Sequence, residues 1–144
     1  MAEIAKVTER RIAKALQELG YVVASIDPNA GVLCYTDAGM LLCTIFGDHA
    51  ALRVSNQHIE MPLAREKLLE LYAWLAEFNR QSTFAIGTAY VEHEFDIAFP
   101  DFSYVISIGQ GVSDAQLTAW ISLCVSEQLE GLRALLKHFV PTVA

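Results

Sequence analysis

The order of apolar and polar residues predicts a helix at the start of the chain and short strands after it. The apolar residues between Ile12 and Leu19 fall on one face of a helix, which Thr8 can cap and Gly20 can end in a left-handed conformation. Four β-rich runs follow, with a hairpin turn at residues 37–39 between the second and the third. These runs span residues 21–26, 32–36, 40–46 and 50–55. We therefore expect one helix and then a meander of three or four antiparallel strands.

A second, amphipathic helix is predicted over residues 63–78. At a helical spacing its large apolar side chains fall on one arc, and its glutamates fall opposite. The Met61-Pro62 pair suits the entry to this helix. Trp74 lies at the edge of the apolar arc, so it belongs either to the rim of the core or to an interface.

Residues 83–91, 94–99 and 102–108 alternate between large apolar and small or acidic side chains, which predicts further strands. The large side chains are expected on the core face, and they include Phe84, Ile86, Tyr90, Phe99 and Phe102. The Pro100-Asp101 step between the last two runs fits a turn or a bulge, so that this region holds two or three strands.

The last predicted helix begins at a capping box and runs to about residue 138. Ser113 is placed as the N-cap, and Gln116 stands three residues later, as that motif requires. Gly131 inside this helix indicates a close packing approach or a break, because glycine lowers helix stability by about 1 kcal/mol relative to alanine. Pro141 is expected to end the helix.

The composition is more apolar and less charged than that of an ordinary domain. Hydrophobic residues make up 53% of the 144 residues and charged residues 19%, against about 25% charged in typical domains. This excess excludes intrinsic disorder and points to a surface for self-association or for a client protein. The net charge of −7 argues against nucleic acid as a partner. With no repeat and no linker, residues 1–144 are expected to form one domain.

The first residues, the short charge-free stretches and the cysteines suggest a soluble, cytoplasmic protein without a membrane segment. The first residues are charged throughout, unlike a signal peptide. The longest charge-free stretches are about 12 residues, short of the roughly 20 that a spanning helix needs. Cys34 and Cys43 could face each other across a hairpin centred on residues 38–39, but buried free thiols are the favoured interpretation, also for Cys124.

Two motifs could form a ligand-binding site, and for each a purely structural role is the favoured explanation. The glycine-rich turn at residues 109–111 could bind a phosphate, but it lacks the further residues of a nucleotide motif and fits a tight connector. Glu92, Glu94 and Asp96 could meet a metal ion, but an extended strand spaces them nearly 7 Å apart, so a solvated acidic hairpin is favoured. We therefore predict no catalytic, cofactor-binding or metal-binding residues and no enzyme activity.

Several short motifs resemble the YbjN family over most of the chain. They are Glu18–Tyr21, the triplet Phe78-Asn79-Arg80, the segment 90–96, and Gly111-Val112-Ser113 followed by Leu117 and Ile121. Members of this family are described as bacterial sensory transduction regulators. The resemblance implies an α+β fold like that of type III secretion chaperones, with an antiparallel sheet, helices packed on it and the order α-β-β-β-α-β-β-α. Such chaperones are small acidic proteins that usually dimerise and hold a segment of a partner. The resemblance supplies no catalytic or ligand-binding residues.

These observations favour a non-enzymatic regulatory or protein-binding module that forms a homodimer and binds a further, unidentified protein. A chaperone-like holder of an extended partner segment is the alternative, followed by a small-ligand sensor or an enzyme. The small residues of the predicted strand at 83–91 leave one face shallow enough for a partner to approach closely. The candidate partner-binding residues are Trp74, Ala85, Gly87, Ala89 and Trp120, with ordinary core edge as the alternative for both tryptophans.

Overall fold

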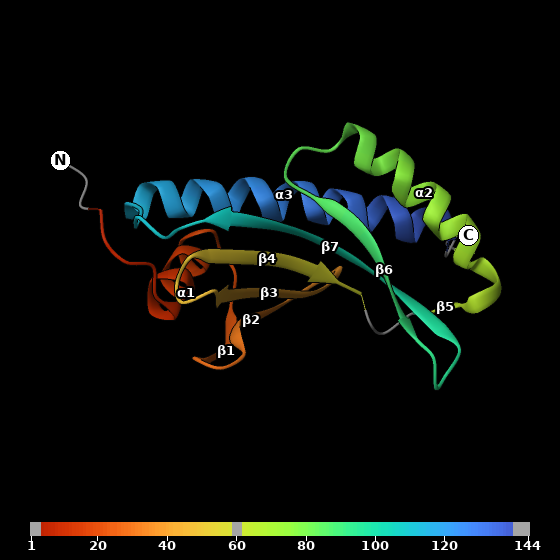
Figure 1. The fold of residues 1–144 in the computed structure, drawn as a ribbon, viewed down its shortest axis with the longest axis horizontal. Coiled ribbons are helices and arrows are strands. Elements are labelled where there is room, and N and C mark those ends of the chain that lie inside the picture. Colours follow the sequence, from red (N-terminus) through yellow and green to blue (C-terminus); the bar gives the residue numbers. More distant parts are fainter. Residues whose placement is uncertain (1–3, 59–61, 140–144) are drawn as a thin grey trace.

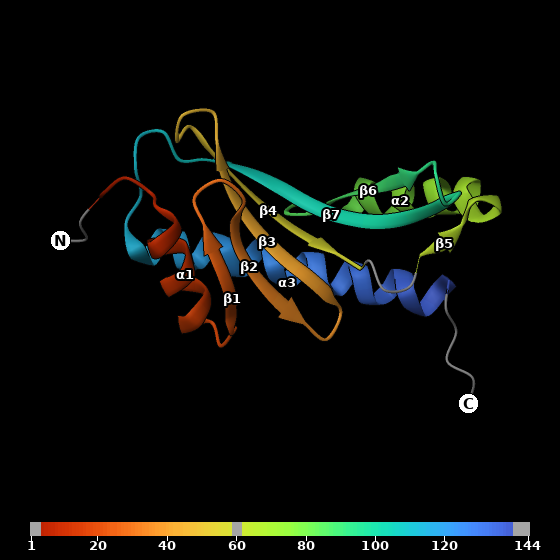
Figure 2. The same ribbon diagram turned by 90° about the horizontal axis from the view of Figure 1, so that it is seen from below.

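Three α-helices lie on one face of a seven-stranded antiparallel sheet in the computed structural model, which describes residues 4–58 and 62–139 (Figure 1). The long helix α3 runs along the whole sheet, and α1 and α2 lie at its two ends (Figure 2). The helices are α1 (Glu9–Glu18), α2 (Leu68–Gln81) and α3 (Asp114–Phe139). The strands are β1 (Val23–Asp27), β2 (Gly31–Thr36), β3 (Gly39–Phe46), β4 (Ala51–Gln57), β5 (Leu63–Ala64), β6 (Ile86–Glu92) and β7 (Ile97–Ser107). The α+β class and the antiparallel sheet are as predicted.

The strand β7 joins two parts of the sheet. Strands β1 to β4 follow one another, and β7 pairs with β4 through residues 101–107. The first part of β7 pairs with β5 on that same side and with β6 on the other. Pro100 lies between the residues paired to β5 and those paired to β4, so its missing N–H removes no ladder hydrogen bond. This region therefore holds two strands, one of the two alternatives expected, and the expected turn or bulge at Pro100 is wrong, because β7 is continuous there.

The faces of β6 are reversed relative to the prediction. Ala85 and Gly87 are buried, whereas the side chains of Ile86 and Tyr90 are 52% and 58% exposed. A Cβ added at Gly87 would stand 2.6 Å from Cδ2 of Leu75 on α2, closer than real carbon contacts come. Only small residues fit under so near a helix, so the large side chains turn to the other face.

The helix α2 begins five residues later than predicted. Leu63 and Ala64 form β5, paired with Ala98 and Ile97 of β7, and one turn of 3₁₀ helix (Arg65–Lys67) leads into α2. Pro62 therefore precedes a short strand and not a helix. Met61 lies outside the described residues.

The first helix and hairpin agree with the sequence, apart from the register of the hairpin. The Thr8 hydroxyl accepts the Arg11 amide at 3.3 Å, and Gly20 has a φ of +94°. Thr36 pairs with Gly39, which leaves two residues in the turn and places Cys34 opposite Leu41, and not opposite Cys43. All three cysteines are free and buried.

The last helix starts and packs as its sequence indicates. The Gln116 amide donates to the Ser113 hydroxyl and the Ser113 amide donates to the Gln116 side chain, which completes the capping box. Gly131 marks a close approach between α3 and α2 and not a break in α3, since a Cβ there would lie 2.6 Å from the Phe78 ring. Pro141 lies outside the described residues.

Candidate protein-binding surfaces

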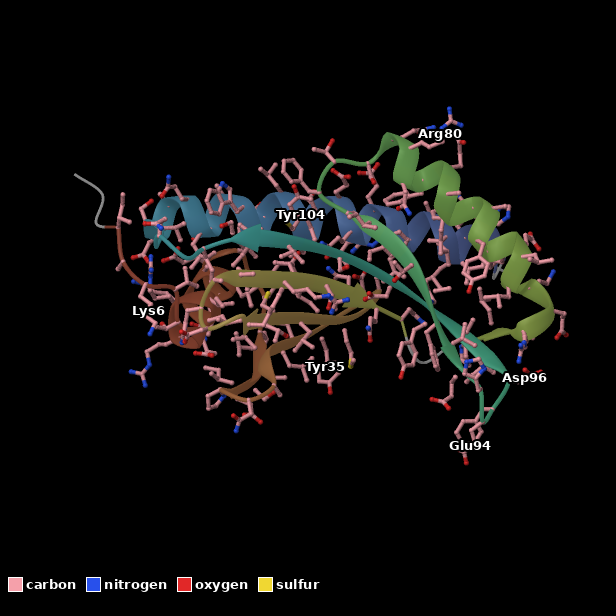
Figure 3. All side chains as sticks on the ribbon, viewed as in Figure 1. Lys6, Tyr35, Arg80, Glu94, Asp96 and Tyr104 are labelled. Atoms are coloured by element: carbon pink, nitrogen blue, oxygen red, sulfur yellow. The ribbon has the colours of Figure 1, made fainter. Side chains whose placement is uncertain are left out.

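The face of the sheet opposite the helices carries large apolar side chains that are exposed to solvent. Tyr35 of β2 is 65% exposed and lies on the side of the sheet away from α3 (Figure 3). Register and strand alternation place two apolar flanks on this face, one from β2 and β3 and one from β6 and β7. We call it the open face, and its flanking side chains are Leu33, Tyr35, Met40, Leu42 and Phe46 on one side and Ile86, Tyr90, Phe99 and Val105 on the other.

An ion pair lies at the centre of the open face. Arg53 of β4 donates to Oδ2 of Asp101 on β7 at 2.7 Å, and the Asp101 side chain is only 7% exposed. Burial raises the pKa of the Asp101 carboxyl, and the Arg53 guanidinium opposes that shift. Arg53 and Asp101 are the charged side chains that β2, β3, β4 and β7 place on this face, so these strands give it no net charge.

The last residues of β7 form a free sheet edge. The Ile108 amide donates to Ala50 O at 2.9 Å, on the side of β4. Backbone groups alternate in direction along a strand, so Val105 and Ser107 direct their N–H and C=O groups to the opposite side. There β6 begins only at Ile86, which pairs with Ser103. Within the described residues no strand pairs with residues 104–107 on that side.

An apolar cavity of about 310 Å³ opens beside this free edge. Tyr104 reaches from β7 toward α3, and its ring meets the Phe84 ring edge-on at 5.7 Å between centroids (Figure 3). We call this cavity the edge pocket, and it is lined by Phe84, Tyr104, Val105, Ile106, Ser107, Trp120 and Cys124. Burial raises the pKa of the Cys124 thiol to about 11, so it is neutral near pH 7 and acts as an apolar wall.

The other sheet edges are partly covered, interrupted or short. The Asn79 side chain on α2 accepts the Gly87 amide at 2.7 Å and donates to the Gly87 carbonyl at 2.9 Å, as a neighbouring strand would. A shift of register between Val23 and Ser25 interrupts β1, and β5 is two residues long. Bulges and very short strands are common ways of protecting an edge from further pairing.

The sequence-predicted site residues lie in three places. Trp120 lines the edge pocket. Trp74 is half-buried on α2 and stacks on Phe78 at 5.6 Å between ring centroids. Gly87 is covered by the chain's own helix α2, Ala85 is buried, and Ala89 is half-buried further along the same strand face. The close approach expected on that face is thus made within the chain, and a role in partner binding stays a prediction for these residues.

The structure adds residues that the sequence interpretation missed. The exposed side chains of Ile86 and Tyr90 were assigned to the core, and the end of β7 had no signal of its own. A strand edge depends on where its neighbour stops, and β6 stops opposite Ser103 because the chain before it bends toward α3, where the Phe84 carbonyl accepts from Gln128. The alternation did show two distinct strand faces, but not which one the helices cover.

The two motifs that could have bound a phosphate or a metal ion make contacts within the chain. The turn at residues 109–111 packs on the N-terminal segment, since a Cβ on Gly111 would lie 2.8 Å from the Ala5 carbonyl. Glu94 and Asp96 lie at the tip of the β6–β7 hairpin (Figure 3), where Asp96 pairs with Arg65 at 3.1 Å. Across residues 4–58 and 62–139, no group of three or more His, Cys, Asp or Glu side chains is arranged to hold a metal ion.

Of the helices in the described part of the chain, none is both long and apolar enough to span a membrane.

Comparison with known proteins identifies the family. The family model of YbjN, described as "Putative bacterial sensory transduction regulator", matches residues 8–136. None of the curated proteins matches the sequence. The crystal structure of YbjN from E. coli, described as "a putative transcription regulator", has a TM-score of 0.78 at 13% identity and covers 94% of this chain and 96% of its own. An uncharacterized protein from Methanothermobacter thermautotrophicus has a TM-score of 0.59 at 14% identity, over 92% of this chain and 99% of its own. With its fold shared by E. coli YbjN and nearly its whole length matched by the family model, this chain belongs to the YbjN family.

Proposed function

We propose that this protein is a non-enzymatic regulatory module of the bacterial cytoplasm that acts through contacts with other protein chains, with a homodimer as its assembled form. The observation that carries this proposal is the open face, where Tyr35, Ile86 and Tyr90 are each more than half exposed. Contiguous exposed apolar side chains on a small protein mark interaction surfaces. The family description as a sensory transduction regulator supports a regulatory role. The three free thiols suit a reducing compartment.

The charge distribution favours a second copy of the chain as the occupant of the open face. The chain carries a net charge of −7, so two copies repel each other over most approaches. On the open face Arg53 neutralises Asp101, and apolar flanks lie on both sides of this pair. Two copies can therefore meet around this pair while Glu92 and Asp27, the acidic side chains that β6 and β1 place on the same face, stay at its margins, and they bury apolar area on both flanks.

The oligomeric state of three variants tests this proposal. Size-exclusion chromatography with light scattering, at micromolar concentration, should show a dimer for the wild type and a monomer for Ile86→Asp. Leu69→Asp is the matched control, because Leu69 is 83% exposed on α2, outside the sheet. It should remain a dimer. A monomeric wild type would overturn the homodimer, and a dimeric Ile86→Asp protein would remove the open face as its interface.

A further inference from the structure

We propose that the edge pocket binds an extended segment of a partner protein, which adds a strand to residues 104–107 of β7, places an apolar side chain in the pocket and sets a basic side chain beside Glu127 and Glu130. The inference rests on the proposed function, since both require binding of other protein chains, but it concerns a second surface, which shares Val105 with the open face. The open face lies opposite the helices, whereas the edge pocket lies between the end of β7 and α3.

The backbone of β7 selects an extended chain. Val105 and Ser107 present N–H and C=O groups where β6 has ended, which is the pattern that an added antiparallel strand satisfies. A strand in this position would continue the line of β6 along β7. The exposed Val105 shows that this part of the strand is open to solvent. A helix or a small ligand would leave these two pairs of backbone groups without partners.

The edge pocket selects an apolar side chain. Successive side chains of the added strand would point alternately to the helix side and to the open side. Those on the helix side would meet Trp120, Tyr104 and Phe84, which are aromatic, and the neutral Cys124 thiol. A cavity of about 310 Å³ lies in the range of small ligand pockets, so it can hold one large apolar side chain of the segment.

The charges near the pocket select a basic residue. From Gln116 to Gly131 the charged side chains of α3 are Glu127 and Glu130, and residues 81–91 carry no charged side chain. Glu127 accepts the backbone amide of Phe84 at 3.0 Å, which fixes its carboxylate beside a residue that lines the pocket, and Glu130 is exposed. Glu130 follows Cys124 by six residues, about 9 Å along a helix. An extended chain covers that distance in about three residues.

The remaining edges do not offer such a site. Asn79 satisfies both backbone groups of Gly87 at the start of the β6 edge, and the bulge in β1 interrupts the edge of that strand. The end of β7 combines a regular unpaired edge with an adjoining apolar cavity.

A defined peptide tests the inference. The probe is an acetylated and amidated heptapeptide, Thr-Phe-Thr-Ile-Thr-Lys-Lys, with a matched peptide that ends in Glu-Glu. Titration followed by amide NMR should shift the Trp120 indole, and hydrogen exchange should slow at the Val105 and Ser107 amides. The lysine peptide should bind at least about tenfold more tightly than the glutamate peptide. The absence of saturable binding, or protection in β1 in place of β7, would overturn the inference.

Two variants separate backbone pairing from charge. Val105→Pro removes one edge N–H without touching the β4 ladder, and Val105→Ala keeps that N–H, so only the first should weaken the lysine peptide, by at least about tenfold. Glu130→Lys should reduce the preference for the lysine peptide while the fold is kept. Equal binding to Val105→Pro and Val105→Ala would refute strand addition. Light scattering on the same samples reports the dimer separately, so a peptide that fails while the dimer persists overturns this inference alone.

Discussion

The Asn56 side chain donates a hydrogen bond from Nδ2 to Oε1 of Gln128 over 2.7 Å, with both residues fully buried. The Gln128 amide nitrogen donates in turn to the Val54 carbonyl at 3.1 Å and to the Phe84 carbonyl at 3.3 Å. One side chain of α3 thus joins β4 to the segment that precedes β6, next to the edge pocket.

Replacing Gln128 should destabilise the fold strongly. Gln128→Met keeps the approximate volume but leaves the Asn56 amide and two carbonyls without these partners, and each unsatisfied buried group costs about 1–3 kcal/mol. We expect a loss of about 2–4 kcal/mol in the free energy of unfolding, measured with urea. The exposed Gln110→Met is the control and should change it by less than about 0.5 kcal/mol. A Gln128→Met protein as stable as the wild type would refute the role assigned to this residue.

Removing the Asn79 amide should open the outer edge of β6. Asn79→Ala deprives the Gly87 amide and carbonyl of their partners, so we expect a loss of about 1–2 kcal/mol and association that grows with concentration. Urea unfolding and light scattering measure the two effects. Arg80→Ala, next in the chain, removes only an exposed ion pair with Glu77 and should change neither. Association equal in both variants would contradict edge protection by Asn79.

Gly131→Ala should destabilise the protein although alanine is the better helix former. The gain in helix propensity is about 1 kcal/mol, but the new Cβ would lie 2.6 Å from the Phe78 ring, which is held between Trp74 and Phe102. Overpacking of this kind costs about 1–3 kcal/mol, so we expect the net effect to be a loss. The double variant with Phe78→Leu should recover part of it in the same urea experiment. A more stable Gly131→Ala protein would show that the ring can move away.

The stability contributed by Asp101 should fall as the pH rises. Its pKa is raised in the folded state by burial, so its contribution is fully present below the ordinary carboxyl pKa and is lost as the pH rises through the raised value. Asp101→Asn stays neutral, so relative to the wild type it should be more stable at about pH 7 than at about pH 4. Arg53→Met removes the positive charge that lowers the Asp101 pKa, so the loss of stability between about pH 4 and pH 7 should be larger in this variant. Parallel stability profiles for the wild type and Asp101→Asn would contradict this assignment.

The caps of the first and last helices could be predicted from the sequence, whereas the start of α2, the path of the chain at Pro100 and the covered face of β6 could not. The caps at Thr8 and Ser113 involve neighbours within one turn, so their residues determine them. Which face of β6 is buried depends on how closely α2 approaches it. The glycine at position 87 indicates a close approach only when it is known that Leu75 of α2 lies over it, and the sequence does not show this contact. The free edge beside Trp120 depends on where β6 starts, which no residue of β7 encodes.

Two residues that carry the family resemblance serve the fold. Phe78 packs against the glycine of α3, and Asn79 satisfies the outer backbone groups of Gly87 on β6. Tyr90, from the same resemblance, lies instead on the open face.

Strand β7 belongs to both parts of the sheet, and this affects how the chain folds and unfolds. Its first half pairs with β5 and β6, its second half pairs with β4, and five residues pair on both sides: Ile97 and Ala98 with β5 and β6, and Asp101 to Ser103 with β4 and β6. Neither half can complete its ladder before β7 is in place, so partial unfolding of one half removes pairing from the other. We therefore expect a single cooperative unfolding transition, with the slowest amide exchange in the residues of β7 that pair on both sides.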